Sequence, residues 1–172
     1  MSHSLTPDCD QCAALCCVAL AIDKGQKFSF DKAAGTPCQH LDHHRCSIHD
    51  VLTSKGCSGC VDYQCDGAGQ RVIQELFEGR SWQEDSALLT PMMRAFADVR
   101  AVHAQLVLLR EARKLSLSPA EETRATTLEE ALNHTVRYAP ERRGEAIRAL
   151  VDEVAVFLRT LAPLVRQRTR SA

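Results

Sequence analysis

The chain has 172 residues, 45% of them hydrophobic, and its 21 basic and 22 acidic side chains leave a net charge of −1. This composition fills a core, so it disfavours a disordered chain, a coiled-coil rod and a membrane protein. A nearly neutral charge gives no general attraction to nucleic acid or to an anionic membrane surface. The unusual feature is that all nine cysteines lie between Cys9 and Cys65.

The N-terminal segment has no basic region, and its apolar run over residues 13–22 is only ten residues long. Such a run is too short to span a bilayer, and it lacks the cleavage pattern of a signal peptide. We therefore expect a cytoplasmic protein without membrane association. In the cytoplasm, clustered cysteines serve metal binding or redox chemistry more often than disulfides. An odd number of cysteines, with Cys16 beside Cys17, also fits a disulfide framework poorly.

Charge and glycine content divide the chain into two regions. Residues 1–90 have a balance of −5, whereas residues 91–172 have a balance of +4 and a single glycine, Gly144. The fold is predicted to be mainly α. We expect a small, loop-rich, metal-bound cysteine domain over residues 1–85 and an α-helical bundle region over residues 86–172.

The first region is predicted to contain only short elements. We expect helices over residues 9–22, 47–54 and 67–77, the first of them capped by Asp8. Weak strand patterns occur over residues 27–30 and 59–64. The rest of this region is predicted to be loop.

The cysteines stand as Cys9-x2-Cys12-x3-Cys16-Cys17, then Cys38, Cys46, Cys57-x2-Cys60 and Cys65. A C-x2-C pair lets both sulfurs reach one ion at about 2.3 Å, as in zinc and iron–sulfur sites. On one continuous helix Cys9, Cys12 and Cys16 fall at about 0°, 300° and 340°, whereas Cys17 falls at about 80°. We therefore expect the first three to share an ion and Cys17 to face a different partner or the core.

Histidines accompany the middle cysteines. His40 follows Cys38 by two residues, and His49 follows Cys46 by three, so either imidazole is a candidate ligand. A solvated loop is the alternative for His40 and its neighbours His43 and His44. Nine thiolates with one or two imidazoles exceed what one structural zinc requires, so we expect two metal ions or one polynuclear centre.

The second region is predicted to form three helices. Thr90-Pro91 starts a helix to about residue 115, and the capping box from Ser118 to Glu121 starts one to about residue 138. A third runs from Pro140 to about residue 165, before a frayed basic tail. Short connections favour an antiparallel three-helix bundle, which either rigidifies the cysteine domain or presents it to a protein partner. The tail lacks aromatic residues, so nucleic-acid binding is not expected.

The cysteine order resembles a known family. The doubled Cys16-Cys17, the step Cys38-x2-Leu41 and the step Cys46-x-Ile48-His49 are similar to the bacterial cysteine-cluster family of zinc- or iron-chelating domains (CxxCxxCC, YkgJ-like) over residues 8–82. The resemblance implies metal binding by these cysteines. Two departures stand out: three residues separate Cys12 from Cys16, where the family usually has two, and Cys57 is an addition.

We therefore expect a metal-binding protein whose cofactor is zinc, or iron or an iron–sulfur cluster. The predicted metal ligands are all nine cysteines, with Cys17 and Cys57 either ligands or structural residues: Cys9, Cys12, Cys16, Cys17, Cys38, Cys46, Cys57, Cys60 and Cys65. One alternative is an iron–sulfur or iron-dependent enzyme, redox or protein-modifying, with an open ligand position. Another is a thiol-based redox or metal sensor.

Overall fold

Helices form most of the regular structure in this computed structural model, which describes residues 4–170. The chain divides into two compact units, residues 1–100 and residues 101–172. The dividing point falls inside the long helix α4 (Leu89–Ala112), later than the predicted boundary after residue 85. No helix in the described part of the chain is both long and apolar enough to cross a membrane.

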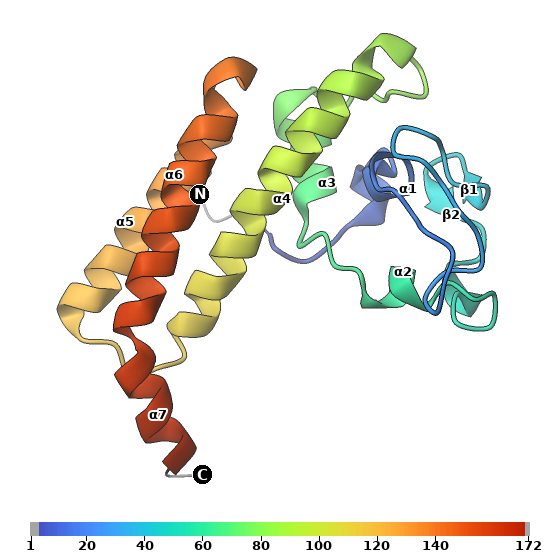
Figure 1. Ribbon diagram of the computed structural model, residues 1–172. Coiled ribbons are helices and arrows are strands. Elements are labelled where there is room, and N and C mark those ends of the chain that lie inside the picture. The colour runs from blue at the N-terminus through green and yellow to red at the C-terminus, as the bar shows by residue number, and fades with distance from the viewer. Residues whose placement is uncertain (1–3, 171–172) are drawn as a thin grey trace. The chain divides into compact units, whose positions relative to one another are not determined.

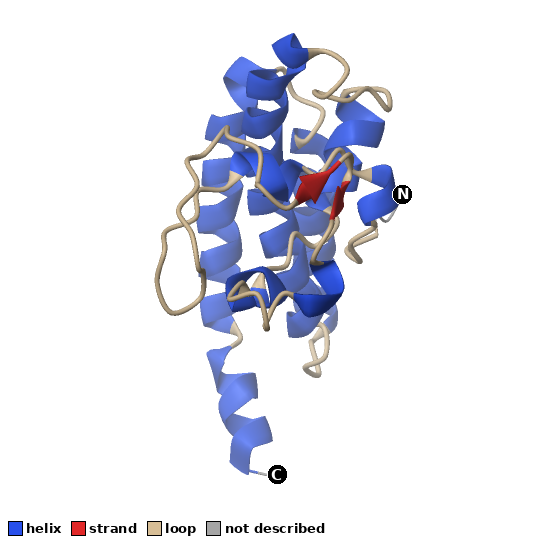
Figure 2. Cartoon of the chain, turned by 90° about the vertical axis from the view of Figure 1, so that its right-hand side faces the viewer, coloured by secondary structure: helices blue, strands red, loops and turns tan. Residues whose placement is uncertain are grey.

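The first unit contains short elements joined by loops, as predicted. In chain order they are the 3₁₀ turn η1 (Cys9–Gln11), α1 (Leu15–Ala19), β1 (Leu41–Asp42), β2 (Arg45–Cys46), η2 (His49–Val51), α2 (Ser58–Asp62), α3 (Ala68–Arg71), the π-helical turn η3 (Val72–Leu76) and η4 (Ser86–Leu88). Strands β1 and β2 pair antiparallel in a small hairpin among these loops (Figure 2).

The predicted helix over residues 9–22 is wrong as a continuous element. Asp8 does cap its start, because Asp8 Oδ1 accepts a hydrogen bond from the Asp10 amide at 3.1 Å. The helix then stops, and Ala14 takes a left-handed conformation with φ 53° before α1 begins. Left-handed φ is unfavourable for alanine. Burial of Leu15 and Val18, both fully enclosed, offsets that cost.

Two further local predictions fail in the first unit. Residues 59–64 do not form a strand, because most of them belong to helix α2. Residues 27–30 form no strand either, and the described pairing lies instead at the β1–β2 hairpin and at an isolated bridge between Ile22 and Lys32. The predicted helix over residues 67–77 is confirmed by α3 and η3.

The second unit confirms the predicted helix starts. Helix α5 (Pro119–Thr135) begins at the predicted capping box, in which Glu121 Oε2 accepts from the Ser118 amide at 2.7 Å. Helix α6 (Pro140–Thr160) begins at its proline and packs against α5, and the two lie side by side in Figure 1. The basic tail, predicted to fray, continues as helix α7 (Ala162–Arg170).

Ion pairs join these helices on their surfaces. Arg113, just after α4, donates to Glu122 Oε1 at 2.7 Å and to Glu129, both on α5. Arg124 of α5 donates to Glu153 of α6 at 2.7 Å. The buried core beneath is apolar apart from a few residues such as His103, which is fully enclosed.

Candidate metal centre

All nine cysteines lie in the first unit as free thiols. Electrostatic interactions between their sulfurs indicate which of them lie within reach of one another, because thiolates repel one another and raise each other's pKa. Two sets of four emerge, which we call the first group and the second group. The first group consists of Cys9, Cys12, Cys16 and Cys65; the second consists of Cys38, Cys46, Cys57 and Cys60.

The first group joins the N-terminal segment to a cysteine about fifty residues later in the sequence. Burial raises the pKa of Cys9, and the neighbouring Cys16 and Cys65 thiols raise it further. Burial also raises the pKa of Cys12 to about 12, again with contributions from Cys16 and Cys65. The thiols of Cys9 and Cys12 are therefore each within electrostatic reach of Cys16 and Cys65, whereas the single helix predicted to carry Cys9, Cys12 and Cys16 does not form.

The second group is assembled by the β1–β2 hairpin and helix α2. Cys46 lies on β2, and the Leu41 amide of β1 donates to the Cys38 carbonyl at 3.0 Å, so the hairpin brings Cys38 near Cys46. Burial raises the pKa of Cys46 and raises that of Cys60 to about 11. In both cases other members of this group, and Cys16, contribute to the rise.

Cys16 interacts with both groups and with its neighbour Cys17. The Cys16 and Cys17 sulfurs are 4.0 Å apart, and this contact is the largest cause that raises the pKa of Cys16, ahead of burial. Two sulfurs on one tetrahedral zinc, each at about 2.3 Å, lie about 3.8 Å apart. The observed separation is close to that value. Cys17 thus faces Cys16, whereas an uninterrupted helix had predicted that it would face elsewhere.

A buried lysine accompanies this doubled cysteine. Lys32 is 6% exposed, and its ammonium donates to the carbonyls of Val18, Leu20, Ala33 and Thr36. Burial lowers the pKa of Lys32, whereas the thiols of Cys38, Cys17 and Cys16 raise it. The ammonium therefore lies within electrostatic reach of three cysteines.

Lys32 also holds the two cysteine-bearing segments together. Its acceptor Val18 follows Cys17, and its acceptor Thr36 precedes Cys38 by two residues. The backbone reinforces this contact, because the Cys38 amide donates to the Cys17 carbonyl at 2.9 Å. Sequence reasoning missed Lys32, since a lysine in a loop is ordinarily solvated.

Helix α3 makes room for Cys12. A Cβ atom added at Gly69 would lie 2.4 Å from the Cys12 sulfur, so only glycine fits there. The turn that follows Cys12 is held by Trp82, whose Nε1 donates to the Ala13 carbonyl at 2.7 Å. Gly69 and Trp82 thereby position a predicted ligand without being ligands themselves.

The histidines lie outside the two groups. His49 Nδ1 lies 3.5 Å from Asp50 Oδ1, and the His49 side chain is 74% exposed. His40 packs edge-on against Phe30 with ring centroids 5.6 Å apart, and His44 shares a hydrogen bond with Ser81 at 3.1 Å. None of these contacts brings an imidazole to a described thiol, so the structure does not join the histidines to the candidate centre.

The donor chemistry suits a thiophilic metal, but the spacing is not yet that of a closed site. Within residues 4–170, no set of three or more Cys, His, Asp or Glu side chains is arranged to hold a metal ion as it stands. Metal binding would therefore need the sulfurs of each group to draw closer together.

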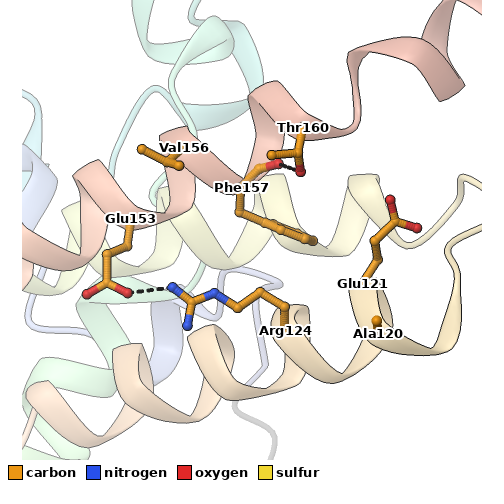
Figure 3. A pocket seen from close by; sticks show the side chains of 7 residues that line it. All are labelled: Ala120, Glu121, Arg124, Glu153, Val156, Phe157 and Thr160. Atoms are coloured by element: carbon orange, nitrogen blue, oxygen red, sulfur yellow. Dashed lines mark hydrogen bonds and ion pairs between the residues drawn. The ribbon is translucent and has the colours of Figure 1, made fainter.

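The surface hollows lie away from the cysteines in sequence. One of about 320 Å³ is lined by residues of α5 and α6, including Arg124, Glu153, Val156 and Phe157 (Figure 3). Across it the Arg124–Glu153 ion pair is formed, and Val156 is 55% exposed. The hollow contains no convergent titratable groups beyond this pair and Glu121, so it is not a candidate active site.

Comparison with known proteins gives one relative. The chain is 35% identical over 173 residues to the uncharacterized protein YybG of Bacillus subtilis (strain 168). The match covers 98% of this chain and 61% of YybG, so the chain spans about three fifths of the length of that relative. No protein-family model matches the chain, and no solved structure does. The resemblance to the cysteine-cluster family therefore depends on the motifs alone.

Proposed function

We propose that the first unit binds two metal ions through its cysteines, with one ion at each group. The observation that carries this proposal is the division of the thiols into two sets of four, with Cys16 of the first group also within electrostatic reach of Cys46 and Cys60 of the second. Four thiolates are a complete ligand set for zinc. The proposed cofactor is zinc in a structural role, and the competing cofactor is an iron–sulfur cluster.

Charge supports a metal–thiolate centre. A zinc ion with four thiolates has a net charge of −2, which is costly to bury without a nearby cation. Lys32 supplies a buried cation beside Cys16, Cys17 and Cys38, and no described carboxylate forms an ion pair with it. A buried ammonium itself needs an anionic neighbour, and metal-bound thiolates would provide one.

The sensor alternative has less support. Reactive sensor cysteines have lowered pKa values and accessible thiolates. Here burial raises the pKa of Cys9, Cys12, Cys46 and Cys60. Thiols of this kind react slowly with peroxide unless a metal first removes their protons.

We further propose that α4, α5 and α6 form an antiparallel three-helix bundle that presents the cysteine unit to a protein partner, in the cytoplasm. Arg113 and Arg124 support this arrangement, since they join the end of α4 to α5 and α5 to α6. The apolar, exposed Val156 beside the α5–α6 hollow is a plausible contact point for that partner.

Metal stoichiometry tests the proposal. The 172-residue chain, purified without oxygen, should contain about two zinc ions and no sulfide. Cys9→Ser and Cys16→Ser should each lose the ion of the first group, whereas Cys60→Ser should lose the ion of the second group. If the protein contains iron and acid-labile sulfide, its cofactor is an iron–sulfur cluster and not zinc. A protein with no bound metal would refute the proposal.

A further inference from the structure

Tyr63 is a polar residue of the first unit to which the metal proposal gives no role. It caps the C-terminus of α2, where the backbone becomes extended (φ −78°, ψ 128°). Cys60 of the second group precedes it by three residues, and Cys65 of the first group follows by two. The Arg100 guanidinium lies over its ring, 5.3 Å from the centroid.

The Tyr63 hydroxyl is buried and unsatisfied. Among the residues that the structure describes, its Oη has no hydrogen-bond partner. Burial raises the pKa of Tyr63, the Arg100 guanidinium partly offsets this rise as a charge and as a hydrogen-bond donor, and the Cys16 and Cys65 thiols add to the rise. A tyrosine hydroxyl carries a hydrogen, and no described group accepts it here.

The surroundings limit which acceptor can take that hydrogen. Arginine carries five N–H donors and no acceptor, so Arg100 cannot serve. The groups in electrostatic reach are the sulfurs of Cys16 and Cys65, both in the first group. A neutral thiol is a weak acceptor, whereas a thiolate bound to a metal accepts a charge-assisted hydrogen bond.

We propose that Tyr63 is a positioning residue of the first group, whose hydroxyl donates a hydrogen bond to a metal-bound thiolate at Cys16 or Cys65. This inference rests on the proposed function, because the acceptor forms only when metal displaces the thiol proton. Such outer hydrogen bonds orient metal ligands and tune the metal. The proposed hydrogen bond would supply the acceptor that the buried Tyr63 hydroxyl lacks.

Tyr138 provides a matched control for a mutational test. It is the other tyrosine of the chain, and an arginine guanidinium also lies over its ring, 5.9 Å from the centroid. It belongs to the second unit, which contains no cysteine. Tyr63→Phe and Tyr138→Phe remove the same atom, each from a ring that faces an arginine.

The test uses the 172-residue chain loaded with cobalt(II), whose thiolate-to-metal charge-transfer absorption reports the thiolates directly. We expect Tyr63→Phe to keep two cobalt ions and to shift part of this absorption to lower energy. The ion of the first group should bind about tenfold less tightly. A lost hydrogen bond raises the energy of the sulfur electrons, which is the reason for the shift. Tyr138→Phe should change neither quantity.

Each other outcome is decisive. An unchanged band and affinity in Tyr63→Phe would overturn the role of Tyr63 while leaving the metal proposal intact. If Tyr63→Phe binds only one ion, Cys60→Ser in the same background decides which group remains: loss of the last ion places the defect in the first group and supports the inference. Retention of that ion overturns it. If the unsubstituted chain binds no cobalt, both proposals fail.

Discussion

The two units of this chain reach stability by different means. The second unit contains the C-terminal part of α4 and the helices α5, α6 and α7 with an apolar core; α5 begins at the Ser118 capping box, α6 begins at Pro140, and Arg113 and Arg124 form ion pairs between helices. The first unit has helices of four or five residues before α4 and a two-stranded hairpin, yet it contains every cysteine. Short helices are marginal alone. The comparison teaches that the first unit needs an additional source of binding energy, which the proposed metal would supply.

Metal removal should produce the largest difference in stability between the two units. Excess chelator is expected to unfold the segment over residues 1–85, because zinc binding contributes about 10–16 kcal/mol to folding in small cysteine domains. Helices α5 and α6 should persist. Limited proteolysis and far-ultraviolet circular dichroism measure this difference. If residues 1–85 keep their protease resistance after chelation, metal is not what holds the first unit together.

A core substitution in α5 should destabilise the second unit and leave metal binding by the first unit unchanged. Leu132 is fully buried, so Leu132→Ala should lower the free energy of unfolding of the second unit by about 2–5 kcal/mol. The bound metal should stay at its original stoichiometry. Val156→Ala serves as a control, because Val156 is 55% exposed and should change stability little. Chemical unfolding followed by circular dichroism measures both variants, and metal loss in Leu132→Ala would show that the units are not independent.

Lys32→Met should weaken metal binding by about 3 kcal/mol, or roughly a hundredfold, because the buried charge that faces Cys16, Cys17 and Cys38 is removed. A competing chelator of known affinity measures the change. Lys55→Met is the matched control, since the Lys55 side chain is exposed in the same unit. Equal affinities in the two variants would show that the charge of Lys32 does not act on the thiolates.

The smallest effect is expected at Gly69. A methyl group in Gly69→Ala would displace the Cys12 sulfur, and overpacking of this kind destabilises by ~1–2 kcal/mol. The loss of metal affinity should appear at the first group only. Gly25→Ala is the control, because nothing lies within 4 Å of a Cβ at Gly25. Metal titration of both variants checks the prediction, and identical curves would contradict it.

Local sequence signals predicted the helical unit well. The Ser118 capping box and the proline at position 140 mark helix starts through interactions within one turn, which can be recognised without knowing the fold. The end of the chain was predicted less well, because α7 continues to Arg170 where fraying was expected.

The cysteine unit was predicted in content but not in arrangement. The sequence shows that cysteines cluster, yet the neighbourhood of Cys65 with Cys9 and Cys12 depends on contacts between distant segments. The predicted directions of Cys9, Cys12, Cys16 and Cys17 also depended on a continuous helix, which Ala14 interrupts. Lys32, Gly69 and Tyr63 carry no local pattern at all, because their roles arise only from what the folded chain places beside them.

The left-handed turn at Ala14 has a consequence for how such sequences diverge. On a helix, one inserted residue would swing every later side chain by about 100°. Between Cys12 and Cys16 the chain is a turn, so an insertion there lengthens a loop and leaves α1 facing the same way. The three-residue spacing, one longer than is usual in the cysteine-cluster family that the sequence resembles, is therefore compatible with an unchanged set of sulfurs. Relatives of this chain should vary in length at this point more freely than within α1.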